Sequence, residues 1–284
     1  MSDSWFNEKI APDGATEDGC HPHEAQALKD YYHQKTNAKE AAQAITRPIE
    51  ESKDPGANLY RLWGLLVDAL VELPITQIPA LIQLLAAIQQ LPEPDLTGRL
   101  TENTPADGFL WRRLPGFGHM WADEHKRDDW RQTLAVSDST QRAQLRAEHV
   151  RKAGIEARLA VADVGGIPLD WGYDCLADAL ESHSAVLDFE IPAAAEWIAI
   201  AGKRLRAGAV DGEESWALER RRDCGKECKS MNLERWSFWE KRLKELLQQV
   251  EATQDAANSA VHDMKALASN SHGSEQNVLQ YQVI

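Results

Sequence analysis

The chain has 284 residues, and 43% of them are hydrophobic, a fraction that is ordinary for a globular protein and excludes a wholly disordered chain. Its formal net charge of −14 repels phosphate backbones and anionic lipid, so we expect neither a nucleic-acid partner nor a membrane partner. The most basic stretch runs from Arg220 to Lys229, but Asp223 and Glu227 interrupt it, and we interpret it as a solvated helical face.

The two ends of the chain differ in composition from the middle. Residues 1–22 hold several prolines and glycines and few core-type residues, which indicates a mobile leader. This stretch lacks the basic start and the apolar run of a secretory signal, so we expect a cytoplasmic or nuclear location. Residues 269–284 are typical of a polar tail. Between these ends we predict a single all-helical domain over residues 23–268.

The first part of this domain carries the clearest helical patterns. Residues 24–46 are rich in alanine, glutamine, lysine and glutamate, which favour a helix that Pro48 should end. Apolar residues then recur at three- and four-residue steps over 59–73 and again over 75–91, with Pro74 between the two stripes. Two such helices with so short a connection are expected to pack as an antiparallel hairpin.

The second part begins after a long loop over residues 92–108, a length that is uncommon unless a loop is functional or disordered. Residues 137–164 are predicted to form a helix, which Asp138 or Ser139 should cap and Gly165-Gly166 should end. Further helices are predicted over 173–182, over 192–206 with Pro192 in its first turn, and over 213–265 with a break near 230–232. Because almost no alternating strand pattern occurs, we predict an all-α fold, either a multi-helix bundle or an irregular array of helical hairpins.

The segment from His119 to His125 holds the densest group of ligand-type side chains. On a helix His119 and Asp123 share a face at four-residue spacing, whereas His125 points elsewhere. A metal site of the His-Glu-x-x-His kind needs a second histidine on that face, so we predict no metal there. His119, Trp121 and Asp123 are the candidate ligand-binding residues, and no motif indicates a catalytic residue.

Other candidate chemistry is explained better by ordinary structure. Asp128-Asp129 lacks the third acid of a motif that holds magnesium and diphosphate, because Gln132 stands in its place. Cys224 and Cys228 are one residue too far apart for a Cys-x-x-Cys knuckle, and we interpret them as free thiols. No nucleophile elbow, Walker loop or dinucleotide fingerprint occurs, so we expect no cofactor.

The ten tryptophans are an unusual feature of the composition. The four that fall on helical stripes are expected in the core: Trp63, Trp197, Trp236 and Trp239. The three in the less regular middle section, of which one or two could line a pocket for a flat hydrophobic ligand, are Trp111, Trp121 and Trp130.

Short packing motifs recur along residues 57–247. They are Leu62-Trp63-Gly64-Leu65-Leu66, the stretch Leu84–Pro92, Leu110-Trp111-x-x-Leu114-Pro115, Glu156-Ala157-Arg158-Leu159, Ala177–Glu181, Ala193–Ile198, Ala201-Gly202 and Arg235-Trp236-x-Phe238-Trp239. By these motifs the chain resembles an uncharacterised, largely fungal family of all-helical proteins, some of which are labelled nuclear-pore-related and several of which lie in secondary-metabolite gene clusters. The resemblance implies a pathway-associated helical protein, and it carries over no catalytic residue.

Two functions from different classes follow. The first is an accessory or binding protein that holds a protein partner or a small hydrophobic metabolite, which the lack of motifs, the tryptophans and the resemblance favour. The second is an enzyme that acts on a small pathway intermediate, with acid–base chemistry from His119, Asp123 or Glu124. A pocket with convergent polar groups and perturbed pKa values would favour the enzyme, and an exposed apolar patch on a bundle without a pocket would favour the binding protein.

Overall fold

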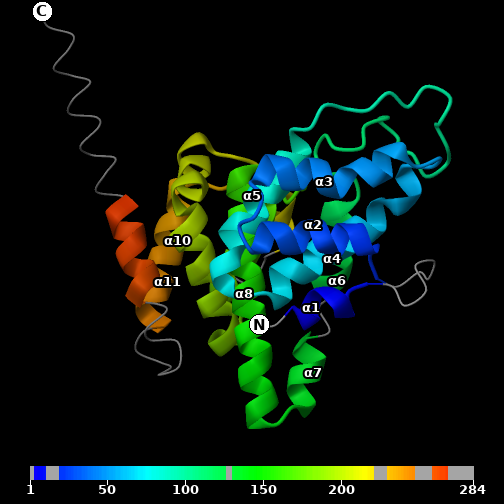
Figure 1. Cartoon of the computed structure of the whole chain (residues 1–284). Helices are drawn as coiled ribbons and strands as arrows, with labels where there is room; N and C mark the ends of the chain where they lie inside the picture. The colour runs from blue at the N-terminus through cyan, green and yellow to red at the C-terminus, as the bar shows by residue number, and fades with distance from the viewer. Residues whose placement is uncertain (1–2, 11–18, 126–129, 221–228, 247–257, 268–284) are drawn as a thin grey trace, which may run out of the picture. The chain divides into compact units, whose positions relative to one another are not determined.

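The computed structural model describes residues 3–10, 19–125, 130–220, 229–246 and 258–267, which form helices joined by turns and loops (Figure 1). Within these ranges the extended pairings are two isolated bridges, Ile10 with Cys20 and Glu214 with Ser230. The predicted all-α class is therefore confirmed, as an array of helices that pack on one another.

The helices belong to two compact units, each with its own core. Unit 1 consists of residues 1–133 and 162–167, and unit 2 consists of residues 134–161 and 168–284. The single all-helical domain over 23–268 stays a prediction, and the residues of that range fall in both compact units.

Unit 1 is built on short helices from the first half of the chain. These are α1 (Ser4–Glu8), α2 (Pro22–Tyr32), α3 (Ala38–Glu51), η1 (Gly56–Asn58), α4 (Leu59–Glu72), η2 (Ile75–Gln77), α5 (Ile78–Gln89), α6 (Phe117–His125) and the start of α7 (Trp130–Val136). The apolar stripes predicted over 59–73 and 75–91 form α4 and α5, whose leucines and isoleucines are buried. The two helices are in contact, but α5 packs more extensively against α3 than against α4.

The single helix predicted over 24–46 is corrected to two helices, α2 and α3. The chain turns between them at Gln34, whose φ of 57° lies in the left-handed region and ends α2. Asn37 then caps α3, because its side chain accepts the N–H of Glu40 while the Glu40 carboxylate accepts the N–H of Asn37. Pro48 does not end α3, which runs on to Glu51. The buried side of α3 continues past the proline to Ile49, and this packing favours the extension.

Part of the expected leader is packed against unit 1. Trp5 and Phe6 on α1 are buried, with their rings in a T-shaped contact at 5.1 Å. The indole of Trp5 donates to Glu72 on α4 at 2.7 Å, and the ammonium of Lys9 contacts Asp68 and Glu72 at 2.6 and 2.8 Å. The mobile leader was predicted from the prolines and glycines of residues 12–22, and the two aromatic residues before them were given no weight.

The centre of unit 1 is an aromatic group around Trp63. Its ring makes edge contacts with Trp111 at 6.4 Å and with Phe117 at 6.0 Å, and its indole donates to the carbonyl of Pro115 at 2.8 Å. Gly165, at a φ of +70°, lies against Phe117 so closely that a Cβ there would come within 2.5 Å of the ring. This confirms Trp63 as a core residue and explains why a glycine occupies position 165.

Unit 2 contains the longer helices. These are α8 (Ser139–Ala162, whose last residue belongs to unit 1), α9 (Asp170–Glu181), α10 (Leu187–Asp211), η3 (Trp216–Arg220), α11 (Leu233–Leu246) and a helix over residues 258–267. The core forms where α9 packs on α10, and it buries Trp197, Trp236 and Trp239 as predicted. Asp138 caps α8 as predicted, since its carboxylate accepts the N–H groups of Thr140 and Gln141 at 2.8 and 2.9 Å.

Two predicted boundaries in unit 2 are corrected. α10 begins five residues earlier than predicted, at Leu187, where the carboxylate of Glu190 accepts the N–H of Val186 at 3.0 Å. Pro192 therefore lies inside the helix and not in its first turn. The helix predicted from residue 213 begins instead with η3 at Trp216, and the break predicted near 230–232 is confirmed, because residues 229–232 are not helical and α11 begins at Leu233. None of the helices in the described part of the chain combines the length and the apolar character needed to cross a bilayer.

Candidate functional site

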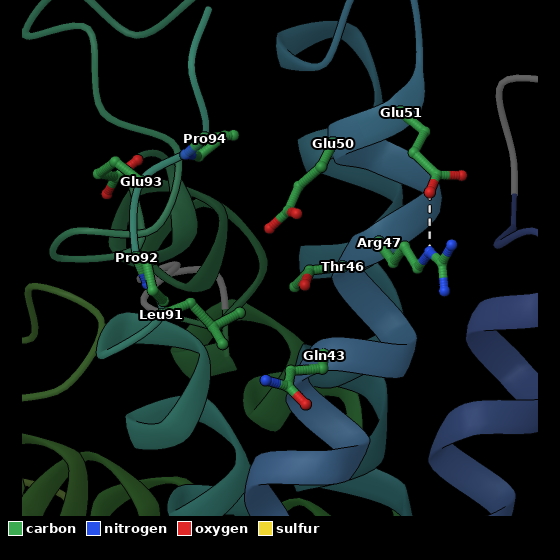
Figure 2. A pocket seen from close by; sticks show the side chains of 9 residues that line it. All are labelled: Gln43, Thr46, Arg47, Glu50, Glu51, Leu91, Pro92, Glu93 and Pro94. Atoms are coloured by element: carbon green, nitrogen blue, oxygen red, sulfur yellow. Dashed lines mark hydrogen bonds and ion pairs between the residues drawn. The ribbon is translucent and has the colours of Figure 1, made fainter.

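A pocket of about 450 Å³ opens in unit 1 between the second half of α3 and the segment that follows α5 (Figure 2). The volume lies in the range of pockets that hold small molecules. Nine residues line it: Gln43, Thr46, Arg47, Glu50, Glu51, Leu91, Pro92, Glu93 and Pro94. One wall is thus a polar helix edge, and the other combines apolar side chains with a single carboxylate.

The helical repeat of α3 places the polar wall. Residues 43, 46 and 50 recur at three- and four-residue steps, so they share one edge of the helix. The apolar stripe beside this edge is buried and packs on α2 and α5: Ala41, Ala42, Ile45 and Ile49. Because the stripe fixes the rotation of α3, the polar edge faces the segment after α5.

Glu50 is the carboxylate that this wall presents to the pocket. Its Oε1 accepts a hydrogen bond from the indole N–H of Trp111 at 2.9 Å, and its main-chain carbonyl accepts one from Arg99. Its Oε2 has no hydrogen-bond partner within the part of the chain that the structure describes. In Figure 2 the side chain points toward the Leu91–Pro94 segment. The carboxylate is therefore held in place by one oxygen and keeps an acceptor on the other.

Glu93 lies on the opposite wall, but its carboxylate is occupied. It accepts the backbone N–H groups of three successive residues, Leu110 at 2.7 Å, Trp111 at 3.1 Å and Arg112 at 2.7 Å. Hydrogen bonds from fixed amides to a carboxylate are stronger than those between neutral groups. Glu93 consequently anchors residues 110–112 and places the indole of Trp111 against Glu50.

The loop between these anchors is tied to the end of α3. Arg99 donates to the carbonyls of Asp95 at 2.6 Å and Ser52 at 3.4 Å, in addition to its bond with Glu50. Thr101 and Asn103 each donate to the carboxylate of Asp54 at 2.8 Å, and these bonds, that of Asn103 foremost, lower the pKa of Asp54. The long loop predicted over 92–108 is therefore fastened beside the pocket by its own polar side chains.

The positive charge at the pocket is neutralised within α3. Arg47 donates to Glu51 at 2.7 Å, and both side chains are well exposed. Figure 2 shows this pair on the side of α3 turned away from the Leu91–Pro94 segment. Of the four ionisable side chains in the lining, Arg47 and Glu51 pair with each other, Glu93 is bound by amides, and Glu50 keeps an open acceptor. The pocket accordingly favours a ligand with a positively charged or hydrogen-bond-donating group.

The residues predicted as ligand-binding lie elsewhere on α6 and do not line this pocket. His119 and Asp123 are exposed on the surface of that helix, and Trp121 is fully buried in the core. The side chains of Glu124 and His125 lie outside the described residues, as do Asp128-Asp129, Cys224 and Cys228. Across the described ranges no group of three or more histidine, cysteine, aspartate or glutamate side chains is placed to hold a metal ion.

Sequence reasoning missed the pocket because its key contacts join residues about sixty positions apart, such as Glu50 and Trp111. A partial signal was present in the Pro92-Glu93-Pro94 triplet, where a charged residue stands between two prolines at the start of the long loop. Trp111, which was considered as a pocket-lining residue, is instead fully buried behind Glu50 and supports it.

Comparison with known proteins finds a match to a protein family. No curated protein and no solved structure matches it. The model of a family described as "Protein of unknown function (DUF3632)" matches residues 63–243, which is more than half of the chain and covers α4 through most of α11. An uncharacterised family was expected from the packing motifs over 57–247. The chain belongs to the DUF3632 family.

Proposed function

We propose that this protein is a binding protein that holds a small amphipathic molecule with a basic nitrogen in the pocket between α3 and the Leu91–Pro94 segment. The observation that carries the proposal is Glu50, a carboxylate that Trp111 holds by one oxygen while the other oxygen has no hydrogen-bond partner in the described chain. Such an acceptor is ready to receive a charge-assisted hydrogen bond without first losing one.

The opposite wall defines the rest of the ligand. Leu91, Pro92 and Pro94 offer apolar surface whose burial by a ligand is favourable at about 25 cal/mol per Å². Proline side chains lose no rotamer freedom on binding, so this wall is already shaped. The ligand that fits both walls has a flat or branched apolar body and a protonated amine. The overall charge of −14 would also attract such a cation.

Binding is favoured over catalysis by the composition of the pocket. Its lining contains no histidine, cysteine or lysine, and Glu93, which could act with Glu50 as an acid–base partner, is engaged by three amides. The enzyme hypothesis rested on residues of α6, and His119 and Asp123 are exposed there outside this pocket. The pocket therefore supports the accessory role.

A role beside a secondary-metabolite pathway is the part of the proposal that rests on the family resemblance, and a location in the cytoplasm or nucleus is proposed together with it. Basic amphipathic compounds would then be the pathway intermediates or products that the protein holds. Deletion of the gene followed by metabolite profiling is the test. We expect a basic compound to rise or fall, and an unchanged profile of basic compounds under conditions that express the gene would contradict this role.

The binding itself is tested by thermal shift with arylalkyl amines such as 2-phenylethylamine and tryptamine at millimolar concentration. We expect the amines to raise the melting temperature of the wild type, because a ligand that binds the native state stabilises it by mass action. Glu50→Gln should abolish the shift. Glu102→Gln, which removes an exposed carboxylate outside the pocket lining, should retain it. Equal shifts in both variants, or none in the wild type, would contradict the assignment of Glu50.

A further inference from the structure

The first turn of α2, away from the pocket, buries a carboxylate that is only half satisfied. Glu24 is fully buried, and its Oε2 accepts the N–H of His21 at 2.8 Å, which caps the helix. Its Oε1 is buried without a hydrogen-bond partner. The Nε2 of His23 is also buried without a partner, and it lies 3.9 Å from that oxygen. Buried polar atoms without partners are rare, and two that face each other across less than 4 Å require an explanation.

Basic side chains lie around this pair. The ring of His21 stacks on that of His23 at 5.5 Å, and its Nε2 lies 3.3 Å from the side-chain oxygen of Asn58. Arg61 on α4 is 8% exposed and donates to the carbonyl of Gly19 at 3.3 Å. The N-terminal end of any helix adds partial positive charge from its free N–H groups. Glu24 thus lies beside His23 and within the electrostatic influence of His21 and Arg61.

Within the described residues, the other elements packed on α2 add no unpaired charge beside Glu24. The side of α3 that is buried there carries no ionisable residue: Ala41, Ala42, Ile45, Thr46 and Ile49. Lys9, which follows α1, is engaged by Asp68 and Glu72 of α4. Just before the helix, the thiol of Cys20 is buried, and this burial, with the charge of Glu24, raises its pKa to about 12. The thiol therefore stays neutral and adds no charge to the group.

Four backbone amides hold the chain in this arrangement. The N–H of Cys20 donates to the carbonyl of Lys9 at 2.8 Å, and the N–H of His21 donates to Glu24. The N–H groups of Glu24 and Ala25 donate to the carbonyl of His21 at 3.1 and 3.2 Å. Residues 19–24 are thereby fastened at one end to the α1 segment and at the other to α2, with Arg61 holding Gly19 to α4.

We propose that His23, beside the buried Glu24 carboxylate, is an acid-sensitive latch that keeps residues 19–24 against α4 at neutral pH and releases them as the pH falls. Protonation places a full positive charge in the first turn of α2, next to His21 and Arg61. Charge of that sign is unfavourable at a helix N-terminus and costs more where water is excluded.

The signs of the two titrations differ. Burial, and then the charge of His21, lower the pKa of His23 from its usual 6.5. Its contribution to stability is therefore fully present above pH 6.5 and is lost as the pH falls from there through the lower pKa of the folded state. Burial raises the pKa of Glu24 from 4.5, so its contribution is present below 4.5 and is lost as the pH rises through the raised value. An ionised Glu24 also offsets the charge of a protonated His23, so removal of the carboxylate should strengthen the response to acid.

Hydrogen exchange of the full-length protein, read by mass spectrometry on the peptide that covers residues 19–25, tests this latch directly. Exchange rates are corrected for the intrinsic effect of pH and compared with a peptide from α4. Between pH 7.5 and 5.5 we expect protection of the four amides to fall by more than about threefold, while that of α4 holds. His23→Gln should remove the fall, and Glu24→Gln, which keeps an oxygen for the N–H of His21, should make it steeper.

The matched control is His33→Gln, because His33 has the same 39% side-chain exposure as His23 but pairs with Asp3. It should leave the response of residues 19–25 unchanged. If protection in the wild type is constant or rises on acidification, or if His23→Gln responds as the wild type does, the latch is wrong. A flatter response in Glu24→Gln would also overturn it, since that result would mean that an ion pair between Glu24 and protonated His23 stabilises the segment in acid.

Discussion

Each unit contains a carboxylate that accepts a hydrogen bond from a tryptophan indole, and the two sites differ in how completely that carboxylate is used. In unit 2 Glu181 is 3% exposed. Its two oxygens accept bonds from the guanidinium of Arg235 at 2.6 and 2.8 Å, and one of them also accepts the indole N–H of Trp239 at 2.7 Å. In unit 1 Glu50 is half-buried, takes one indole N–H from Trp111, and lines a pocket.

The difference follows from the cost of removing a charge from water. A carboxylate that stays charged in a core needs partners for both oxygens, because an unpaired buried charge costs several kcal/mol. Glu24, which lacks a partner on one oxygen, instead has a pKa that burial raises. A carboxylate at the edge of a pocket is still hydrated, so one oxygen can stay open at little cost. Glu181 accepts hydrogen bonds on both oxygens, which indicates a structural role. Glu50 accepts a bond on one oxygen, which indicates that the other is available to a ligand.

The largest expected effect comes from removing the partner of Glu181. Arg235→Met should lower the free energy of unfolding by roughly 3–5 kcal/mol, because it leaves Glu181 charged and buried. Urea unfolding measures this loss. The control is Arg142→Met, which breaks a pair with Asp188 whose side chains are 42% and 24% exposed, and which should cost no more than about 1 kcal/mol. Similar losses in the two variants would show that Glu181 is no more dependent on its partner than a surface acid.

A smaller effect is expected from removing each indole N–H while a six-membered aromatic ring is kept; the costs below are those beyond the packing that each fully buried indole loses. Trp239→Phe deprives a buried carboxylate of a charged hydrogen bond that water cannot replace, and it should cost about 2 kcal/mol. Trp111→Phe acts on a carboxylate that water reaches, and it should cost about 1 kcal/mol or less. Thermal unfolding of the two variants gives the ranking, and a larger loss for Trp111→Phe would reverse the comparison.

The features that the sequence predicted correctly are those that depend on residues close together in the chain. The leucine stripes of α4 and α5 and the cap at Asp138 are patterns within a few residues, so periodicity and capping rules identified them. The boundaries at Pro48 and Pro192 were wrong because burial on neighbouring helices outweighed the local effect of proline. The pocket depends on Glu93 meeting residues 110–112 and on Trp111 meeting Glu50, contacts that only the folded chain creates.

The most direct measurement of the central claim is a thermodynamic cycle on ligand charge and on Glu50. Calorimetric titration compares 2-phenylethylamine with the uncharged 2-phenylethanol, for the wild type and for Glu50→Gln. The wild type should bind the amine more tightly than the alcohol by roughly 1.5–3 kcal/mol, the usual contribution of a hydrogen bond to a charged group. In Glu50→Gln this preference should disappear, while the alcohol binds both proteins equally and the free energy of unfolding changes by less than about 0.5 kcal/mol. An amine preference that persists in Glu50→Gln would contradict the assignment of the open carboxylate as the ligand-binding group.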